Sequence, residues 1–126
     1  MDFKNVRFTK EHEWVRADGN QEATVGITDF ASGELGDVVY VELPKVGSEV
    51  KAMQSMGTIE AVKTVADLFA PVSGTVTAVN PSLEQHPDLV NQDPFGEGWF
   101  VRVKMKDRKE FDALMDRAAY QSMIGK

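Results

Sequence analysis

The sequence of 126 residues contains no cysteine. This absence excludes a disulfide framework, a thiolate nucleophile and any zinc or iron–sulfur site with cysteine ligands. Any redox chemistry must therefore come from a cofactor. Histidine is nearly absent too, with His12 and His86 alone, so the chain has little from which to build a catalytic triad or a histidine-rich metal site.

Basic residues are in the minority. Fourteen Lys and Arg stand against twenty Asp and Glu, which gives a net charge of −6 and a pI of about 4.9. A protein that binds nucleic acid or an anionic membrane needs a basic face, and this balance argues against both. The acidic surface should instead favour protein partners with basic patches, mainly by steering their encounter.

Long hydrophobic runs are missing as well. No stretch approaches the roughly twenty apolar residues of a membrane-spanning helix, and the first residues resemble neither a signal peptide nor an Arg-rich transit peptide. We therefore expect a soluble protein of a bacterial-type cytoplasm, or of the mitochondrial matrix if a transit peptide was removed. With 42% hydrophobic residues, residues 1–126 should form a single domain.

Short strands separated by turn signals fill most of the chain, as in a sandwich or barrel. Two such runs flank Asp18-Gly19-Asn20 and predict a β-hairpin over residues 13–27. Residues 99–106 alternate apolar and basic side chains, so this strand should face a core on one side only. The other predicted strands cover residues 38–43, 49–51, 57–61, 64–69 and 75–79.

Two segments are predicted to be helical. Residues 28–36 form a short helix with Thr28 or Asp29 as the cap. The second helix begins at Asp107, where a carboxylate three residues later completes a capping-box pattern, and its apolar spacing continues to Ile124. We therefore predict one continuous C-terminal helix.

A short internal echo relates two parts of the chain. Residues 44–50 and 71–76 each contain a proline, a turn with glycine and an outgoing strand. Lys63 lies between them. The echo suggests two similar halves with a pseudo-twofold relationship whose midpoint carries this lysine.

Lys63 has two interpretations from the residues alone. It is most simply a lysine on an edge strand that blocks aggregation, within a β-rich interaction module. It could also be a Schiff-base nucleophile, which requires a lowered pKa. The nearest charged residues, Glu60 and Asp67, favour the protonated amine and argue against that chemistry.

Several longer motifs occur in a recognisable order. They are Glu11–Val15, Gly26–Asp29, Leu35–Pro44, Glu60–Lys63, Ser73–Gly74 and Leu89–Trp99. Together they resemble the H-protein family of the glycine cleavage system, whose members are lipoyl carriers, and the resemblance runs from about Phe8 to Tyr120. The Glu-x-x-Lys motif alone would be weak, but several independent motifs in order are specific.

The resemblance implies a fold and a cofactor. The fold is mainly β, a lipoyl/biotinyl-carrier-like barrel-sandwich hybrid of antiparallel strands with a short internal helix and a C-terminal helix. Lys63 is implied to carry lipoate in amide linkage, which fits a chain without its own sulfur redox groups. The lysine should stand on a tight hairpin, although Val62 and Lys63 are poor turn formers and the residues alone predict an unbroken strand.

The resemblance also implies a non-catalytic role. Members of the family take an aminomethyl group from a pyridoxal-phosphate glycine decarboxylase and pass it to a tetrahydrofolate-dependent aminomethyltransferase. Dihydrolipoamide dehydrogenase reoxidises the arm, and a lipoylating enzyme is the fourth partner. A tethered arm suits this shuttle because it presents its sulfur at high effective concentration. We expect a monomer that makes transient contacts with its partners.

Four further residues match family positions. Glu60 and Gly74 match positions that present the lysine to the lipoylating enzyme, although for Gly74 backbone geometry alone is a sufficient explanation. Glu13 and Asp67 match carboxylates of a cleft that holds the loaded arm's ammonium group and slows its hydrolysis. The alternative interpretation is that Glu13 and Asp67 are solvated carboxylates at strand ends.

The chain departs from the family pattern at a few positions. Ala61 stands where Ser is usual and Thr64 where Ala is usual, and neither change should block modification. Phe30 replaces a more polar aromatic residue or His, which would alter the cleft wall.

Two other functions compete with glycine cleavage as the role of the chain. A relay that donates lipoyl groups to other enzymes stays open, whereas a biotin carrier is disfavoured because Met does not flank the lysine.

Overall fold

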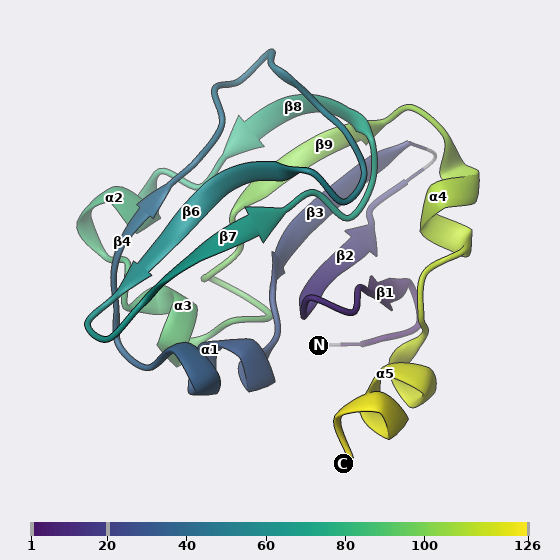
Figure 1. The fold of residues 1–126 in the computed structure, drawn as a ribbon. Coiled ribbons are helices and arrows are strands. Elements are labelled where there is room, and N and C mark those ends of the chain that lie inside the picture. Colours follow the sequence, from purple (N-terminus) through teal and green to yellow (C-terminus); the bar gives the residue numbers. More distant parts are fainter. Residues whose placement is uncertain (1, 20, 126) are drawn as a thin grey trace.

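Two antiparallel sheets make up the centre of the molecule in the computed structural model, which describes residues 2–19 and 21–125 (Figure 1). The larger sheet has the spatial order β1 (Val6–Phe8), β2 (Glu13–Ala17), β3 (Glu22–Ile27), β9 (Val101–Met105), β8 (Gly74–Val79) and β5 (Glu49–Val50). The smaller sheet has the order β4 (Val38–Glu42), β6 (Ser55–Ala61) and β7 (Val65–Phe69).

The main core lies between these two sheets. Val25 and Val76 enter it from the larger sheet, and Ile59 and Leu68 enter it from the smaller one. On β9 the buried and exposed residues alternate, which confirms the predicted one-sided strand. Removal of this apolar surface from water is the dominant force that holds the sheets together.

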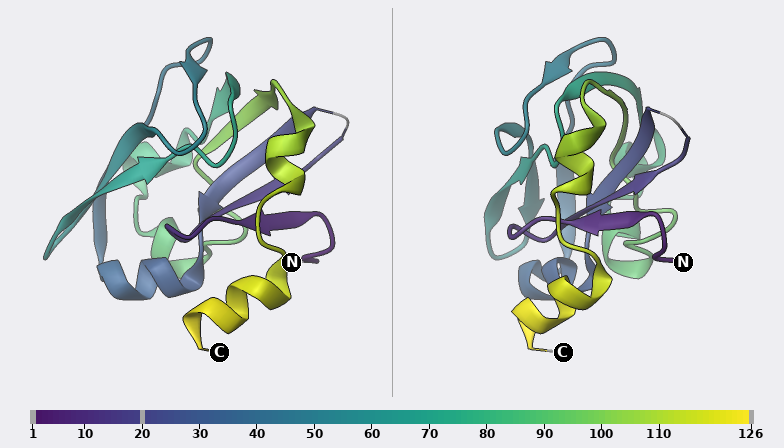
Figure 2. Two further views of the ribbon diagram at one scale, coloured as in Figure 1. Left: turned by 45° about the vertical axis from the view of Figure 1, so that its right-hand side comes forward. Right: turned by 90° about the vertical axis from the view of Figure 1, so that its right-hand side faces the viewer.

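A second apolar cluster lies outside the first and joins β1 to the C-terminus. The rings of Phe8 and Tyr120 stack with centroids 4.6 Å apart, and both side chains are fully buried together with Trp14. Figure 2 shows α5 (Arg117–Ile124), which carries Tyr120, below β1. The predicted strands did not include β1.

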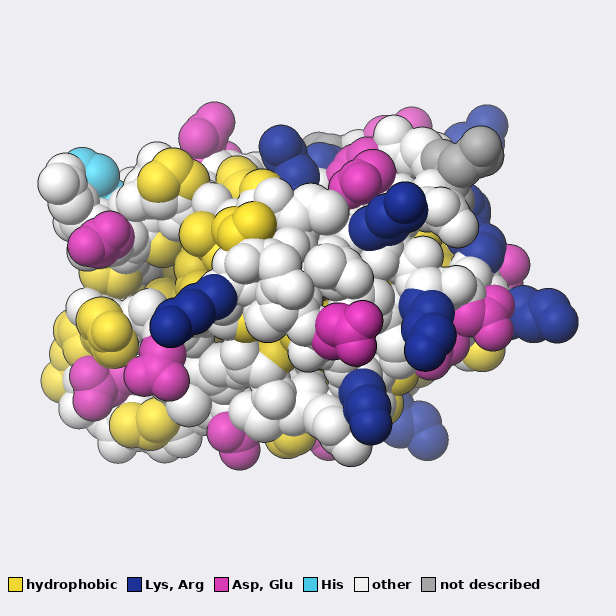
Figure 3. Space-filling view, turned by 90° about the horizontal axis from the view of Figure 1, so that it is seen from above, with side chains coloured by type: hydrophobic (Ala, Val, Ile, Leu, Met, Phe, Trp, Pro, Cys, Tyr) yellow, Lys and Arg dark blue, Asp and Glu magenta, His cyan; other side chains and the backbone are white. Residues whose placement is uncertain are grey.

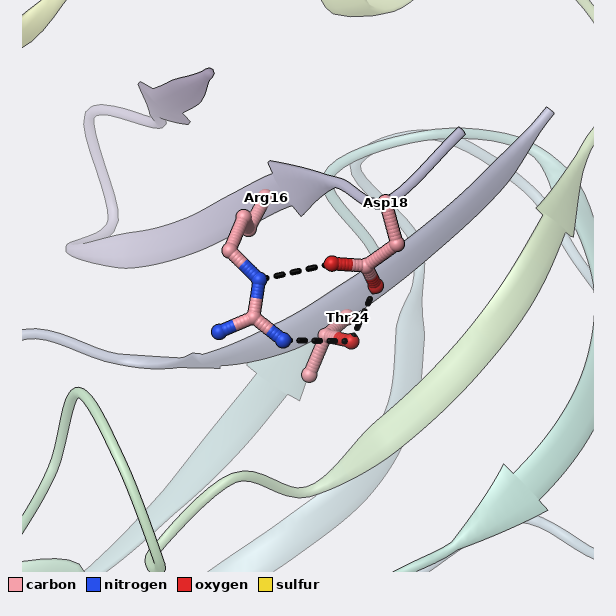
Figure 4. Close-up of polar contacts among 3 residues, drawn as sticks. All are labelled: Arg16, Asp18 and Thr24. Atoms are coloured by element: carbon pink, nitrogen blue, oxygen red, sulfur yellow. Dashed lines mark hydrogen bonds and ion pairs between the residues drawn. The ribbon is translucent and has the colours of Figure 1, made fainter. Parts of the chain in front are cut away.

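A polar contact secures the predicted hairpin of β2 and β3. Arg16 Nε donates to Asp18 Oδ1 at 2.7 Å, and Thr24 Oγ1 donates to the other oxygen of Asp18 at 2.5 Å (Figure 4). Arg16 also donates to Thr24 Oγ1 at 3.3 Å. This triangle joins the two strands near their turn, whose residue Asn20 lies outside the described residues.

The short internal helix is confirmed as α1 (Asp29–Leu35). Its N-cap is Thr28, whose side chain accepts a hydrogen bond of 3.1 Å from the backbone N–H of Ala31. Two single-turn helices, α2 (Ser82–Gln85) and α3 (Leu89–Gln92), were not predicted. None of the helices in residues 2–19 and 21–125 has the length and apolar character needed to cross a membrane.

The predicted C-terminal helix is present, but it is not continuous from Asp107. The segment forms α4 (Arg108–Asp112) and α5, and the chain between them is extended at Met115, which pairs with Phe8 on β1. A new N-cap at Asp116 then starts α5. Glu110 does not complete a capping box, because its carboxylate accepts hydrogen bonds from the backbone and hydroxyl of Ser73 at 2.7 and 3.0 Å.

Candidate functional site

Lys63 lies at the tip of a β-hairpin. Strands β6 and β7 pair from Ser55↔Phe69 to Glu60↔Val65, and the pairing ends in a turn at residues 62–64. The backbone N–H of Ala61 donates to the carbonyl oxygen of Thr64 at 2.8 Å and closes the turn. Lys63 is exposed at this tip, which projects at the lower left of Figure 1. The hairpin that the resemblance implied is therefore present, and the unbroken strand that the residues alone predicted is not.

The internal echo corresponds to a strand pair. β5 and β8, the outgoing strands of the two echoed segments, pair with each other through Val50↔Gly74. Val62 lies midway in sequence between these two residues, and the bond between Val62 and Lys63 lies midway between Glu60 and Val65. Both pairings are thus centred in sequence on the lysine turn.

Asn91 on α3 holds the base of the lysine turn. Its side chain donates to the carbonyl oxygen of Gly36 at 2.7 Å and accepts from the backbone N–H of Val38 at 2.9 Å. Between these two residues, the carbonyl oxygen of Asp37 accepts the backbone N–H of Val62 at 3.0 Å. One amide side chain therefore fixes the segment on which the turn rests. The family-like stretch Leu89–Trp99 contains Asn91, but no sequence signal indicated this role.

A cleft of about 170 Å³ lies between α1, β2 and the edge strand β7. The structure brings Glu13 and Asp67 together in its wall, as the resemblance implied. Its lining contains four carboxylates and one histidine and no Lys or Arg, and consists of Glu11, His12, Glu13, Ile27, Ala31, Glu34, Leu35, Ile59, Ala66 and Asp67. A small cation with an apolar stem suits such a cleft, because the floor is aliphatic and the charged groups are all acidic.

Glu13 is buried in this wall, with 2% of its surface exposed. The Thr9 hydroxyl donates to Oε1 at 2.5 Å, and the backbone N–H of Phe69 donates to Oε2 at 3.3 Å. Burial raises the pKa of the Glu13 carboxyl from 4.5 to about 7, because desolvation penalises the charged form more than these two hydrogen bonds favour it. Glu13 is therefore not a solvated strand-end carboxylate.

Asp67 differs from Glu13 in its surroundings. It is exposed on β7, opposite Thr58, and accepts a hydrogen bond of 3.2 Å from the hydroxyl of Ser55. The cleft thus combines the desolvated carboxyl of Glu13 with exposed carboxyls such as that of Asp67.

Glu60 and Gly74 lie far apart in the topology. Glu60 is exposed on the central strand of the small sheet, directly beside the lysine turn. Gly74 is buried in the larger sheet, where a Cβ atom would collide with the carbonyl oxygen of Lys104. The structure brings Glu60 to Lys63 but does not bring Gly74 there.

A hydrogen-bond network behind the cleft centres on Tyr120, to which the sequence analysis assigned no role. The Tyr120 hydroxyl lies 2.7 Å from Thr28 Oγ1 and 2.9 Å from His12 Nδ1. His12 lines the cleft with a positive φ of 71°, and its ring packs 4.9 Å from that of Phe30. Burial raises the pKa of the Tyr120 phenol above 10. The C-terminal helix therefore supports the cleft wall.

The remaining described residues do not suggest another kind of centre. No group of three or more His, Asp or Glu in the parts described is arranged to hold a metal ion. His86 ends α2, and neither it nor the stretch Asp93–Gly98 lines the cleft.

The two facing sheets and the exposed hairpin lysine define a carrier domain of the lipoyl–biotinyl type. A sequence model described as "Glycine cleavage H-protein" matches residues 6–126, and the chain belongs to this family. It is thus a lipoyl-carrier component of the glycine cleavage system and is not itself catalytic.

Similar proteins support this assignment along the whole chain. The glycine cleavage system H protein of Chlorobium phaeovibrioides is 56% identical over 123 residues, which cover 96% of this chain and 95% of the relative. That of Geobacillus kaustophilus is 50% identical over 121 residues, covering 96% and 94%. The crystal structure of an H protein from Mycobacterium marinum superposes with a TM-score of 0.90 at 34% identity and covers all of both chains.

Proposed function

We propose that Lys63 carries the lipoyl group, in amide linkage to its Nζ. The observation that supports this most is the position of an exposed lysine at the tip of a hairpin whose base is fixed by backbone hydrogen bonds and by Asn91. A ligase can reach such an amine from several directions, and the rigid strands keep it in place.

The proposed role is that of a shuttle in glycine cleavage. When bound, lipoate supplies a dithiolane that accepts electrons and the aminomethyl group. The proposed route runs from a pyridoxal-phosphate glycine decarboxylase to a tetrahydrofolate-dependent aminomethyltransferase, followed by reoxidation through dihydrolipoamide dehydrogenase. The chain itself contributes position: it presents the arm to each enzyme in turn.

The acidic cleft is proposed to shelter the loaded arm between enzymes. Glu13 and Asp67 would hold the ammonium group, and the aliphatic side chains of Ile27, Leu35 and Ile59 would exclude water from the arm. An ammonium group in the cleft favours the ionised form of Glu13, so docking of the arm should release the proton that this carboxyl holds near neutral pH.

Reconstitution with purified glycine decarboxylase tests the role. The lipoylated chain should support exchange of labelled bicarbonate into the carboxyl carbon of glycine, and the Lys63→Arg variant should not. Loss of exchange in a fully lipoylated wild-type chain, together with transfer of its lipoyl group to another carrier's lysine, would instead establish the relay function.

A further inference from the structure

Exposed hydrophobic side chains gather around the lysine turn. Among the described residues, seven large hydrophobic side chains are exposed, and four of them lie at this end of the small sheet: Val39, Tyr40, Val62 and Val65, exposed by 48%, 53%, 71% and 60%. We call these four residues the tip patch. Clustered exposed apolar groups on a soluble protein mark interaction sites more often than scattered ones do.

The strand register makes these four residues neighbours. Tyr40 on β4 and Val65 on β7 flank Glu60 on β6, so all three lie in one row across the small sheet. Val62 is in the turn, three residues before Val65.

A β-bulge contributes to the patch. The register of β4 shifts between Val38 and Tyr40, so Val39 has no partner on β6. Consecutive residues of a regular strand point to opposite faces, but here both Val39 and Tyr40 are exposed. Bulges commonly redirect side chains at functional sites. This one turns an extra apolar group outward near the base of the lysine turn, since the preceding residue, Val38, pairs with Ala61.

Carboxylates lie within and around the patch, with Glu60 between Tyr40 and Val65 and the others at its edges. Asp37, Glu42, Glu60 and Asp67 are all exposed on the same strands or at their ends. Residues 17–101, which contain the small sheet, include thirteen Asp and Glu but only three Lys and Arg, of which Lys63 is one. In contrast, Lys and Arg side chains are concentrated toward the side of α4, on the right of Figure 3.

We propose that the tip patch is the docking surface for the enzyme that acylates Lys63, and that this enzyme presents an apolar centre with a rim of Lys and Arg. The inference rests on the proposed attachment at Lys63. In that step Nζ attacks the carbonyl carbon of an activated lipoyl group, an acyl adenylate or thioester, and a new amide forms. The nucleotide or thiol leaves, and Nζ loses a proton.

The position of the reacting atom selects this partner over the others. The acylating enzyme must bring its active site to Nζ itself and therefore against the turn. The enzymes that act on the dithiolane meet the arm at its far end, so their chemistry takes place several bonds away from the turn. An acidic rim also steers a basic partner to the one amine that it must reach.

A matched pair of valine variants tests the proposal. Val65→Ser removes an apolar side chain from the patch, and Val46→Ser removes one with the same exposed fraction, 60%, from the loop after β4. The kcat/KM of lipoylation by a purified lipoate ligase with ATP and lipoate is followed by intact mass. We expect Val65→Ser to lower kcat/KM roughly tenfold, because the valine side chain would be buried in the complex with the enzyme and that apolar contact is lost. We expect Val46→Ser to leave kcat/KM unchanged.

A charge-reversal pair provides the second measurement. Glu42→Lys, at the rim, should lower kcat/KM and weaken its dependence on salt, whereas Glu84→Lys on α2 should do neither. Equal rates for Val65→Ser and Val46→Ser would overturn the proposal. So would normal lipoylation of Val65→Ser combined with failure of the lipoylated variant to serve glycine decarboxylase, since the patch would then belong to that enzyme. If the wild-type chain is not modified at Lys63, the proposed function itself fails.

Discussion

The backbone N–H of Phe69 donates a hydrogen bond of 3.3 Å to the buried carboxyl of Glu13. This contact joins β2 of the larger sheet to β7, the strand that follows the lysine turn. The carboxyl that faces the cleft is therefore positioned by the packing of one sheet on the other. The Thr9 hydroxyl, in the connection between β1 and β2, holds the carboxyl's other oxygen, and the geometry of the cleft should survive movement of the arm.

The raised pKa of Glu13 predicts a pH-dependent stability. Its pKa is about 7 in the folded protein against 4.5 for the free side chain, so the folded state binds the extra proton between these values. The free energy of unfolding should therefore fall as the pH rises from about 4.5 to about 7 and level off above, by on the order of 3 kcal/mol from this group. Urea unfolding across this range measures it.

The Glu13→Gln variant isolates the effect. It lacks the titration, so its stability relative to the wild type should increase with pH over the same window. Glu34→Gln changes an exposed carboxyl in the same cleft and should follow the wild-type profile. Parallel curves for the wild type and Glu13→Gln would contradict the buried state of this carboxyl.

The cleft predicts protection of the loaded arm. Glu13→Gln should speed hydrolysis of the bound aminomethyl group roughly tenfold, because a desolvated carboxylate is the stronger partner of the ammonium, and Asp67→Asn should have a smaller effect. Release of formaldehyde from the isolated loaded protein gives the rate. Glu60→Gln is the control, since Glu60 does not line the cleft. Equal hydrolysis rates for the Glu13→Gln, Asp67→Asn and Glu60→Gln variants would show that the arm is held elsewhere.

The contacts of Asn91 predict a local effect on the lysine turn. Asn91→Ala leaves the backbone groups of Gly36 and Val38 without their partner and should cost about 1–3 kcal/mol of stability. Hydrogen exchange at the Val62 amide should accelerate as this stability is lost. Gln92→Ala, at the exposed neighbour on α3, should change neither quantity. Unchanged hydrogen exchange at the Val62 amide in Asn91→Ala would mean that the Asn91 hydrogen bonds do not stabilise the turn.

Two glycine substitutions separate backbone geometry from lysine presentation. Gly74→Ala should lower stability by about 1–3 kcal/mol or more, because the added methyl group meets the Lys104 carbonyl. Gly33→Ala should raise it by about 0.5–1 kcal/mol, since its Cβ meets nothing within 4 Å inside α1. Thermal unfolding measures both. Folded Gly74→Ala should be lipoylated at the wild-type rate, and a specific loss of lipoylation would instead support presentation by Gly74.

The sequence predicted the elements that depend on local pattern. The alternation along β9 and the cap of α1 by Thr28 are properties of a few adjacent residues, and both were confirmed. The C-terminal helix is interrupted because Met115 pairs with Phe8, more than a hundred residues away. No local signal contains that contact.

The site was predictable only in part, for the same reason. The family-like motifs indicated Glu13 and Asp67, and the structure brings them to one cleft. The turn at Lys63 depends on a hydrogen bond from Val62 to Asp37, and the support of the cleft depends on Tyr120. Such long-range contacts override weak local turn preferences and cannot be read from residue spacing.

Intact mass spectrometry after expression in a host that makes lipoate tests the central claim most directly. The wild-type chain should gain the mass of one lipoyl amide, and the Lys63→Arg variant, which keeps the charge, should gain none. Such a result would establish Lys63 as the attachment site. An unmodified wild-type chain beside a lipoylated carrier of the host would contradict the account.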